Sequence, residues 1–137
     1  MTPSPARKPW WRRWFGSRSE RAAVRYLKHQ GFTIVRRNYR SPHGEIDIVA
    51  VEGGTLVFVE VRSTGTEDVE RTAASVDDIK QQRLTRLALY FLQQHRLLDR
   101  AARFDVVVVT WPADRREPLI LHHRQAFEAT GRFQMFS

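Results

Sequence analysis

The chain has 137 residues and a formal net charge of +8, and 42% of its residues are hydrophobic. This length suits one domain with its own core, and the absence of cysteine excludes disulfides and zinc–thiolate sites. No apolar run is long enough to cross a bilayer, and the basic N-terminus has no apolar signal segment, so we expect a cytoplasmic protein. The basic charge favours a polyanionic partner, nucleic acid before an anionic membrane surface, although an arginine-rich composition alone gives the same charge.

Residues 1–16 are predicted to form a basic, tryptophan-rich tail in front of a domain spanning 17–130, with a C-terminal tail at 131–137. In the first tail, prolines precede the run Trp10-Trp11-Arg12-Arg13-Trp14-Phe15. Such a run can stack on bases or lie among lipid headgroups. We favour the alternative of a disordered tail whose aromatic rings fold over a nearby apolar patch.

A helix is predicted from Ser17 to Gln30, because Ser17 and Glu20 have the spacing of a capping box and Gly31 can end the helix. A β-rich segment follows from Phe32 to Tyr39, and residues 41–44 have the composition of a turn.

The most informative stretch is Gly44 to Thr64, in which two β-branched runs flank Gly53-Gly54. Because tight hairpin turns need positive φ, we predict an antiparallel hairpin with Gly53-Gly54 as its loop. Period-2 alternation then gives one face that is entirely apolar, made of Ile46, Ile48, Ala50, Val57, Val59 and Val61.

The same register places Asp47 opposite Glu60, and Glu45 opposite Arg62, on the other face of the hairpin. Like charges that face each other across two strands are destabilising, so something must compensate the repulsion between these two carboxylates. A bound divalent cation such as Mg²⁺ would compensate it, and so would a proton shared by the two carboxylates. The alternative is a solvated strand end at which Arg62 neutralises the pair.

A second helix is predicted from about Asp77 to about Leu98, with Ser75 and Asp78 as its capping box. Beyond it we predict a strand from Phe104 to Trp111, a strand from Leu119 to His123 and a short helix from Gln125 to Thr130. The valine run inside the first of these strands is typical of parallel pairing in mid-sheet. The order α-β-β-β-α-β, then β-α, indicates an α/β fold with a mixed β-sheet and flanking helices.

Basic residues recur every third position near the start of the second helix, at Lys80, Arg83 and Arg86. We assign this stripe to binding the nucleic-acid backbone. The alternative is an ordinary solvated helix face.

Several short motifs together resemble a known family. They are Ser19-Glu20, Gly31-Phe32, Asn38-Tyr39, Gly44-Glu45-Ile46-Asp47, Phe58-Val59-Glu60-Val61-Arg62, Lys80 and Arg103-Phe104-Asp105-Val106. The chain resembles the YraN-like family of small bacterial proteins from about Ser19 to about Phe127. That family is similar to the PD-(D/E)XK nucleases, whose restriction-endonuclease-like fold also occurs in archaeal Holliday-junction resolvases.

The resemblance implies a metal-dependent endonuclease that acts on DNA rather than RNA, including branched DNA. It implies that Asp47, Glu60 and Glu20 hold Mg²⁺ or Mn²⁺, although Glu20 can alternatively serve only as a helix-capping residue. A homodimer is implied by analogy, because a junction has two-fold symmetry.

Arg62 departs from the superfamily pattern, which has lysine at the corresponding position. An arginine cannot accept a proton from the attacking water, but it can clamp a phosphate or neutralise developing charge. We therefore include Arg62 with Asp47, Glu60 and Glu20 in the predicted catalytic set. The alternative function is a nucleic-acid-binding module with a nuclease-like fold and lost or weakened catalysis.

Overall fold

The computed structural model describes residues 10–65 and 76–127. The elements are α1 (Trp10–His29), β1 (Thr33–Ser41), β2 (Gly44–Glu52), β3 (Thr55–Thr64), α3 (Asp78–Gln94), β4 (Ala102–Thr110) and β5 (Leu119–Phe127). They form a five-stranded sheet of order β1-β2-β3-β4-β5, in which only β3 and β4 are parallel among the described strands. The predicted α/β class with a mixed sheet and flanking helices is confirmed, and the arrangement is consistent with a restriction-endonuclease-like fold.

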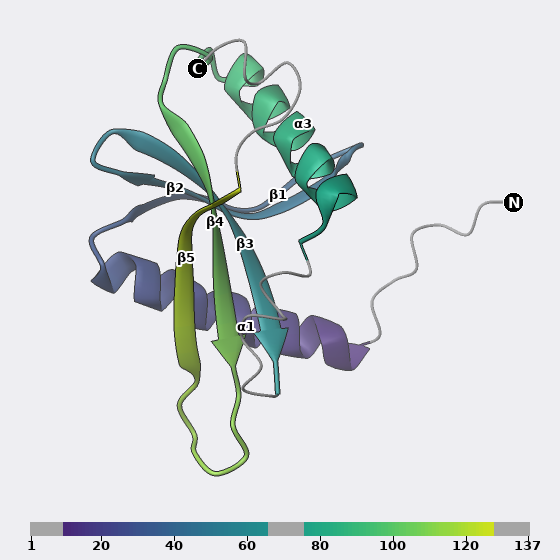
Figure 1. Cartoon of the computed structure of the whole chain (residues 1–137), viewed down its shortest axis with the longest axis vertical. Coiled ribbons are helices and arrows are strands. Elements are labelled where there is room, and N and C mark those ends of the chain that lie inside the picture. The colour runs from purple at the N-terminus through teal and green to yellow at the C-terminus, as the bar shows by residue number, and fades with distance from the viewer. Residues whose placement is uncertain (1–9, 66–75, 128–137) are drawn as a thin grey trace, which may run out of the picture.

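The two described helices cover opposite faces of the sheet (Figure 1). On one face, Leu27 of α1 packs in a cluster with Val57 and Val107. On the other face, Phe91 of α3 packs in a cluster with Phe58. The valines of β4 alternate between the two clusters, so β4 is covered on both sides and pairs in parallel with β3, as its apolar run predicted.

The β2–β3 hairpin has the predicted loop, and the predicted register is confirmed near the turn, but the predicted pairs Asp47–Glu60 and Glu45–Arg62 lie beyond the described pairing. Gly53 and Gly54 both have positive φ, of 55° and 86°, as a type I′ turn requires. The pairs run from Glu52↔Thr55 to Ile48↔Val59.

The prediction that Ile46 shares a face with Ile48 is wrong. Ile46 packs in the cluster that contains α3, whereas Ile48 packs in the cluster that contains α1. The described β2–β3 pairing ends at Ile48, and one residue further the Asp47 side chain accepts a hydrogen bond from Val61 N at 2.8 Å. The alternation therefore breaks at Asp47, where a side chain replaces the backbone acceptor of the ladder.

Both predicted helix ranges need correction. Helix α1 begins at Trp10, so Ser17 lies inside the helix rather than at its cap. Helix α3 is capped by Asp77, whose side chain accepts from Lys80 N at 2.9 Å, while the predicted cap Ser75 lies outside the described residues. It ends at Gln94 instead of Leu98 because the chain turns at Arg96, which adopts a left-handed φ of 56°.

The short helix predicted from Gln125 is also wrong over Gln125–Phe127, because these residues continue β5. Buried Asp105 explains this, since its Oδ1 accepts from Gln125 N at 2.9 Å across a register shift in the β4–β5 pair. Residues 128–130 and both predicted tails up to residue 9 and from residue 131 lie outside the described residues. In the described part of the chain, no helix has the length and apolarity needed to cross a membrane.

Candidate functional site

Carboxylates from two elements meet at the end of the β2–β3 hairpin far from its turn. Glu20 of α1 and Glu45 and Asp47 of β2 each offer an oxygen, and these oxygens all lie within 4.8 Å of one another. Glu20 is in mid-helix, which removes the alternative that it serves as a capping residue. Glu45 and Asp47 share this side because residues two apart in a strand point the same way.

Asp47 is the most constrained of these acids. Burial raises the pKa of Asp47 well above its usual range, and the nearby charges of Glu60, Glu20 and Glu45 raise the pKa further. The hydrogen bond from Val61 N acts in the opposite direction, because it stabilises the ionised form. The four acids therefore repel one another, and a cation or a proton bound among them relieves this repulsion.

Glu60 is buried on β3, with 8% of its surface exposed. Its Oε1 lies 2.7 Å from Lys80 Nζ of α3 and 3.7 Å from Arg62 Nε. Glu60 is thus close enough to Asp47 to raise its pKa, yet it stands beside the three-carboxylate group and not within it. Two cations neutralise Glu60, so the predicted partnership with Arg62 is only part of its environment.

Asn38 of β1 links two of the acids. The hydrogen-bonding pattern assigns its amide nitrogen to the side of the carboxylates, where it donates to Glu45 Oε1 at 2.9 Å and to Glu20 Oε2 at 3.0 Å. Asn38 adopts a left-handed φ of 53°, which asparagine tolerates better than most residues. Arg40 Nε adds a distant ion pair to Glu45 Oε2 at 3.5 Å.

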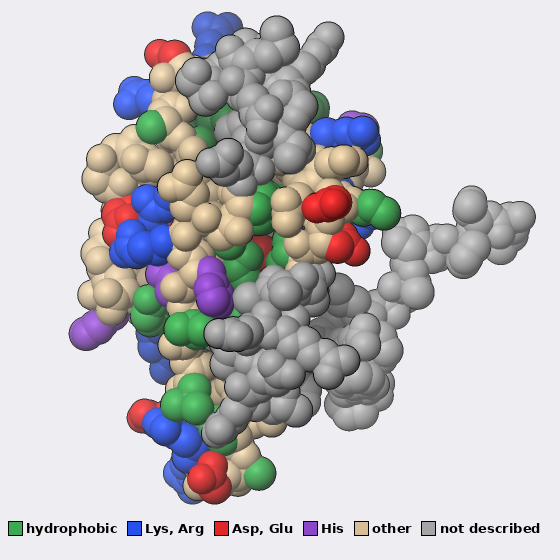
Figure 2. All heavy atoms as spheres, viewed as in Figure 1, with side chains coloured by type: hydrophobic (Ala, Val, Ile, Leu, Met, Phe, Trp, Pro, Cys, Tyr) green, Lys and Arg blue, Asp and Glu red, His purple; other side chains and the backbone are tan. Residues whose placement is uncertain are grey.

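The predicted basic stripe divides into separate roles. Lys80 reaches a carboxylate of the site, and 32% of its side chain is exposed. Arg83 is exposed and packs near the β1–β2 turn, since its Cδ lies 3.5 Å from where a Cβ on Gly44 would stand. Arg86 is exposed on the same helix. On the face shown in Figure 2, Lys and Arg side chains are spread among acidic ones and do not form one continuous patch.

Sequence reasoning did not assign Glu45 and Asn38 to this site. The sequence contained a signal for Glu45, because it stands two residues before Asp47 and therefore shares its side of the strand, but we expected Glu45 to face Arg62. The structure pairs it with Arg40 of β1 instead, and the described β2–β3 register does not reach Arg62. Asn38 comes from a neighbouring strand, and only the β1–β2 register brings it near the acids.

The fold and the acidic cluster define an α/β protein with a carboxylate site built on its central hairpin. The model of uncharacterised protein family UPF0102 matches residues 19–109. A UPF0102 protein of Desulfosudis oleivorans is 45% identical over 118 residues, which cover 86% of this chain and 93% of the relative. A UPF0102 protein of Moorella thermoacetica is 47% identical over 106 residues, covering 77% and 87%. The chain therefore belongs to the UPF0102 family, which confirms the YraN-like resemblance.

Proposed function

We propose that this protein is a metal-dependent nuclease of the PD-(D/E)XK superfamily that hydrolyses phosphodiester bonds in DNA, with branched DNA among its substrates. The observation that carries the proposal is the convergence of Glu20, Glu45 and Asp47 within 4.8 Å on the central hairpin. A cytoplasmic location and a homodimer complete the proposal, and both stay predictions.

The donor set fits Mg²⁺ or Mn²⁺. These hard cations prefer carboxylate oxygens, and the acids of the site supply several that repel one another. The predicted ligands Asp47 and Glu20 form the proposed set with Glu45, and Glu60 stays a predicted ligand that lies beside these three acids. When bound, the ion would supply Lewis-acid chemistry by polarising a phosphoryl oxygen and favouring a hydroxide nucleophile.

Lys80 and Arg62 supply positive charge beside the acids. Lys80 Nζ forms an ion pair with Glu60 Oε1 at 2.7 Å, and an ammonium group carries three N–H donors, so Lys80 can also orient the attacking water or hold a phosphate oxygen. Arg62 is suited to stabilising the charge that develops on the phosphate. The superfamily pattern has a lysine where this chain has Arg62. In this proposal Lys80 of α3 supplies that amine instead.

The second candidate is a nucleic-acid-binding module that does not cut. Arg62 favours it, because an arginine cannot serve as the proton acceptor. In both candidates Lys80, Arg83 and Arg86 contact the phosphate backbone, so the affinity falls as salt rises.

The decisive experiment measures cleavage of branched, single-stranded and duplex DNA with Mg²⁺, with Mn²⁺ and with EDTA. We expect cleavage by the wild type with either metal, and none by Asp47→Asn or with EDTA. Asp99→Asn makes the same Asp-to-Asn change at an exposed position of the α3–β4 connection, outside both the acidic site and its neighbours, and serves as the matched control, with unchanged cleavage.

Thermal unfolding gives a second readout that does not need activity. A ligand at a hundred times its Kd adds about 2.7 kcal/mol to stability. Mg²⁺ should therefore stabilise the wild type and Asp99→Asn, but not Asp47→Asn. Salt-dependent binding without cleavage on any substrate would reject the nuclease and keep the binding module, and absence of both would reject both candidates.

A further inference from the structure

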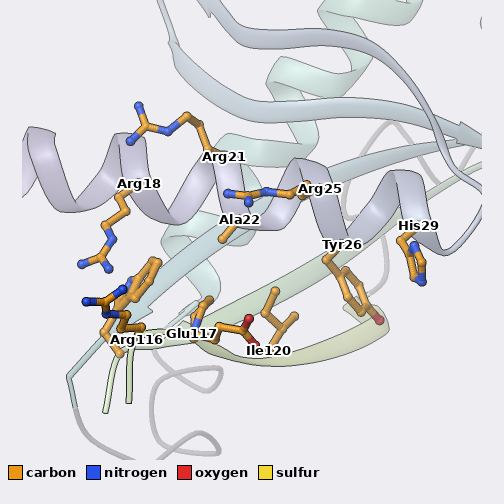
Figure 3. A pocket seen from close by; sticks show the side chains of 11 residues that line it. Arg18, Arg21, Ala22, Arg25, Tyr26, His29, Arg116, Glu117 and Ile120 are labelled. Carbon is orange, nitrogen blue, oxygen red and sulfur yellow. The ribbon is translucent and has the colours of Figure 1, made fainter. Parts of the chain in front are cut away.

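A groove of about 610 Å³ lies between α1 and the loop that joins β4 to β5 (Figure 3). This volume falls in the range of natural ligand sites, which is about 300–1,000 Å³. Its lining includes Arg18, Arg21, Arg25 and Arg116, with Glu117 as the one acidic lining residue. The carboxylates of the candidate active site do not line it, so the groove is a separate feature.

The cations of the groove form a row and not a single cluster. Arg18, Arg21 and Arg25 are three and four residues apart on α1, and a helix rises 1.5 Å per residue, so the row is about 10 Å long. Arg116 belongs to the opposite wall, and Figure 3 shows Arg18 reaching from α1 toward it. A row of cations between two walls suits a ligand with repeated negative charges, such as a chain of phosphates.

One end of the groove offers a flat, fixed stacking surface. The Arg18 guanidinium carbon lies 3.8 Å from the centre of the Trp111 ring. The Trp111 indole is held in turn, because its Nε1 donates to Ser19 Oγ at 2.8 Å, and Ser19 Oγ donates to Ser63 Oγ at 2.7 Å. Aromatic rings and arginine planes are the surfaces on which unpaired bases stack.

Tyr26 is a second fixed ring in the lining. Its hydroxyl lies 3.1 Å from His122 Nδ1, and His122 Nε2 lies 2.7 Å from Oδ2 of fully buried Asp105. The groove thus combines its arginines, which are exposed except for half-buried Arg18, with aromatic groups that internal hydrogen bonds hold in place. Neither a purely ionic surface nor a purely apolar pocket has this combination.

We propose that the groove binds a single strand of nucleic acid, with phosphates at Arg25 and Arg116 and a base near the Arg18–Trp111 pair. A single strand fits because its unpaired bases are free to stack on protein side chains, whereas the bases of a duplex are already stacked on one another inside the double helix. The inference rests on the proposed function, since the strand would belong to the same DNA substrate. Helix α1 would then carry Glu20 to the acidic site and the arginine row to the strand.

The test measures the anisotropy of fluorescein-labelled oligothymidylate in EDTA, so neither metal nor cleavage contributes. The groove variant is Arg25→Ala/Arg116→Ala, and the matched control is Lys28→Ala/Arg115→Ala, which removes two cations from the same helix and loop outside the lining. All four residues are exposed, and thermal unfolding verifies that both variants fold. Arg25→Lys/Arg116→Lys keeps the charges and should keep most of the affinity.

We expect the groove variant to bind about tenfold more weakly, and the control to change less than about twofold. Two lost phosphate contacts should also lower the slope of log K against log salt by about 1.4, at about 0.7 per contact for a single strand. Equal weakening of both variants, or no weakening, would overturn the inference. Tighter binding of a duplex of the same length, with the same loss in the groove variant, would also overturn it.

Two further arms separate this inference from its competitors. If the groove variant loses binding to phosphatidylserine vesicles but keeps its affinity for oligothymidylate, the groove is a lipid-binding surface and the inference fails. If the wild type does not cleave DNA but the groove variant still loses affinity, the nuclease fails and the groove stands. If the wild type cleaves and the groove variant binds normally, the nuclease stands and the groove inference fails.

Discussion

Lys80 Nζ of helix α3 lies 2.7 Å from Glu60 Oε1 of strand β3. The contact brings an ammonium group to the acidic hairpin of a chain that has arginine at position 62. It depends on the start of α3, where the Asp77 side chain accepts from Lys80 N and fixes the first turn. Lys80 therefore belongs with the carboxylates, and not only with the basic stripe of its helix.

Lys80→Met should lower the rate of DNA cleavage about a hundredfold, because it removes an N–H donor that stabilises the negative charge developing in the transition state. This loss corresponds to an activation barrier about 2.7 kcal/mol higher. Stability should fall by about 1–3 kcal/mol, because buried Glu60 loses the nearer of its two cations and keeps only Arg62 Nε at 3.7 Å. Single-turnover cleavage and thermal unfolding measure the two effects. Arg86→Met on the same helix is the control, and an equal loss there would reduce Lys80 to a general phosphate contact.

Arg62→Lys should raise cleavage more in the Lys80→Met background than in the wild type. If the site needs only one amine near Glu60, the new lysine at position 62 is redundant in the wild type and replaces the missing amine in Lys80→Met. We expect a gain of about tenfold in that background, which corresponds to about 1.4 kcal/mol. The double-mutant cycle is measured by single-turnover kinetics, and equal gains in both backgrounds would show that positions 62 and 80 act independently.

Asp47→Asn should stabilise the protein at neutral pH in EDTA. Burial, followed by the charges of Glu60, Glu20 and Glu45, raises the pKa of Asp47 in the folded state. The stability that Asp47 contributes is therefore present below its unfolded pKa and is lost as pH rises through the folded pKa. Thermal unfolding across pH should show a higher Tm for Asp47→Asn at neutral pH and a vanishing difference in acid. A lower Tm at neutral pH would contradict the repulsion.

Glu52→Gln should destabilise the fold by about 1 kcal/mol at neutral pH, the usual size for a partly exposed ion pair. Hydrogen bonds from Arg124 and Arg103 lower the pKa of Glu52 to about 2 although burial opposes them, and they join β2 to β5 and β4. A lowered pKa gives stability that is present above the unfolded value and is lost as pH falls toward 2. Urea unfolding of the two proteins should converge in acid, and Glu117→Gln should follow the wild type throughout.

The sequence by itself determined the central hairpin and the class of fold. Gly53-Gly54 permits the turn, and the residues of β2 from Glu52 back to Ile48 then meet their partners by counting outward from that turn. The apolar run of β4 likewise indicated a strand covered on both sides. These features were readable because turn chemistry and side-chain alternation depend on neighbours along the chain.

Only the tertiary structure decided which charges share the site. Glu45 lies beside Asp47 and Glu20, and Lys80 lies beside Glu60, because α1 and α3 cross the sheet at positions that no local pattern encodes. The ladder also ends where Asp47 bonds to Val61 N, which places Ile46 on the opposite face from the one predicted. The packing of helices on a sheet is set by the whole apolar surface that they bury together, so contacts between their polar side chains emerge only once that packing is known.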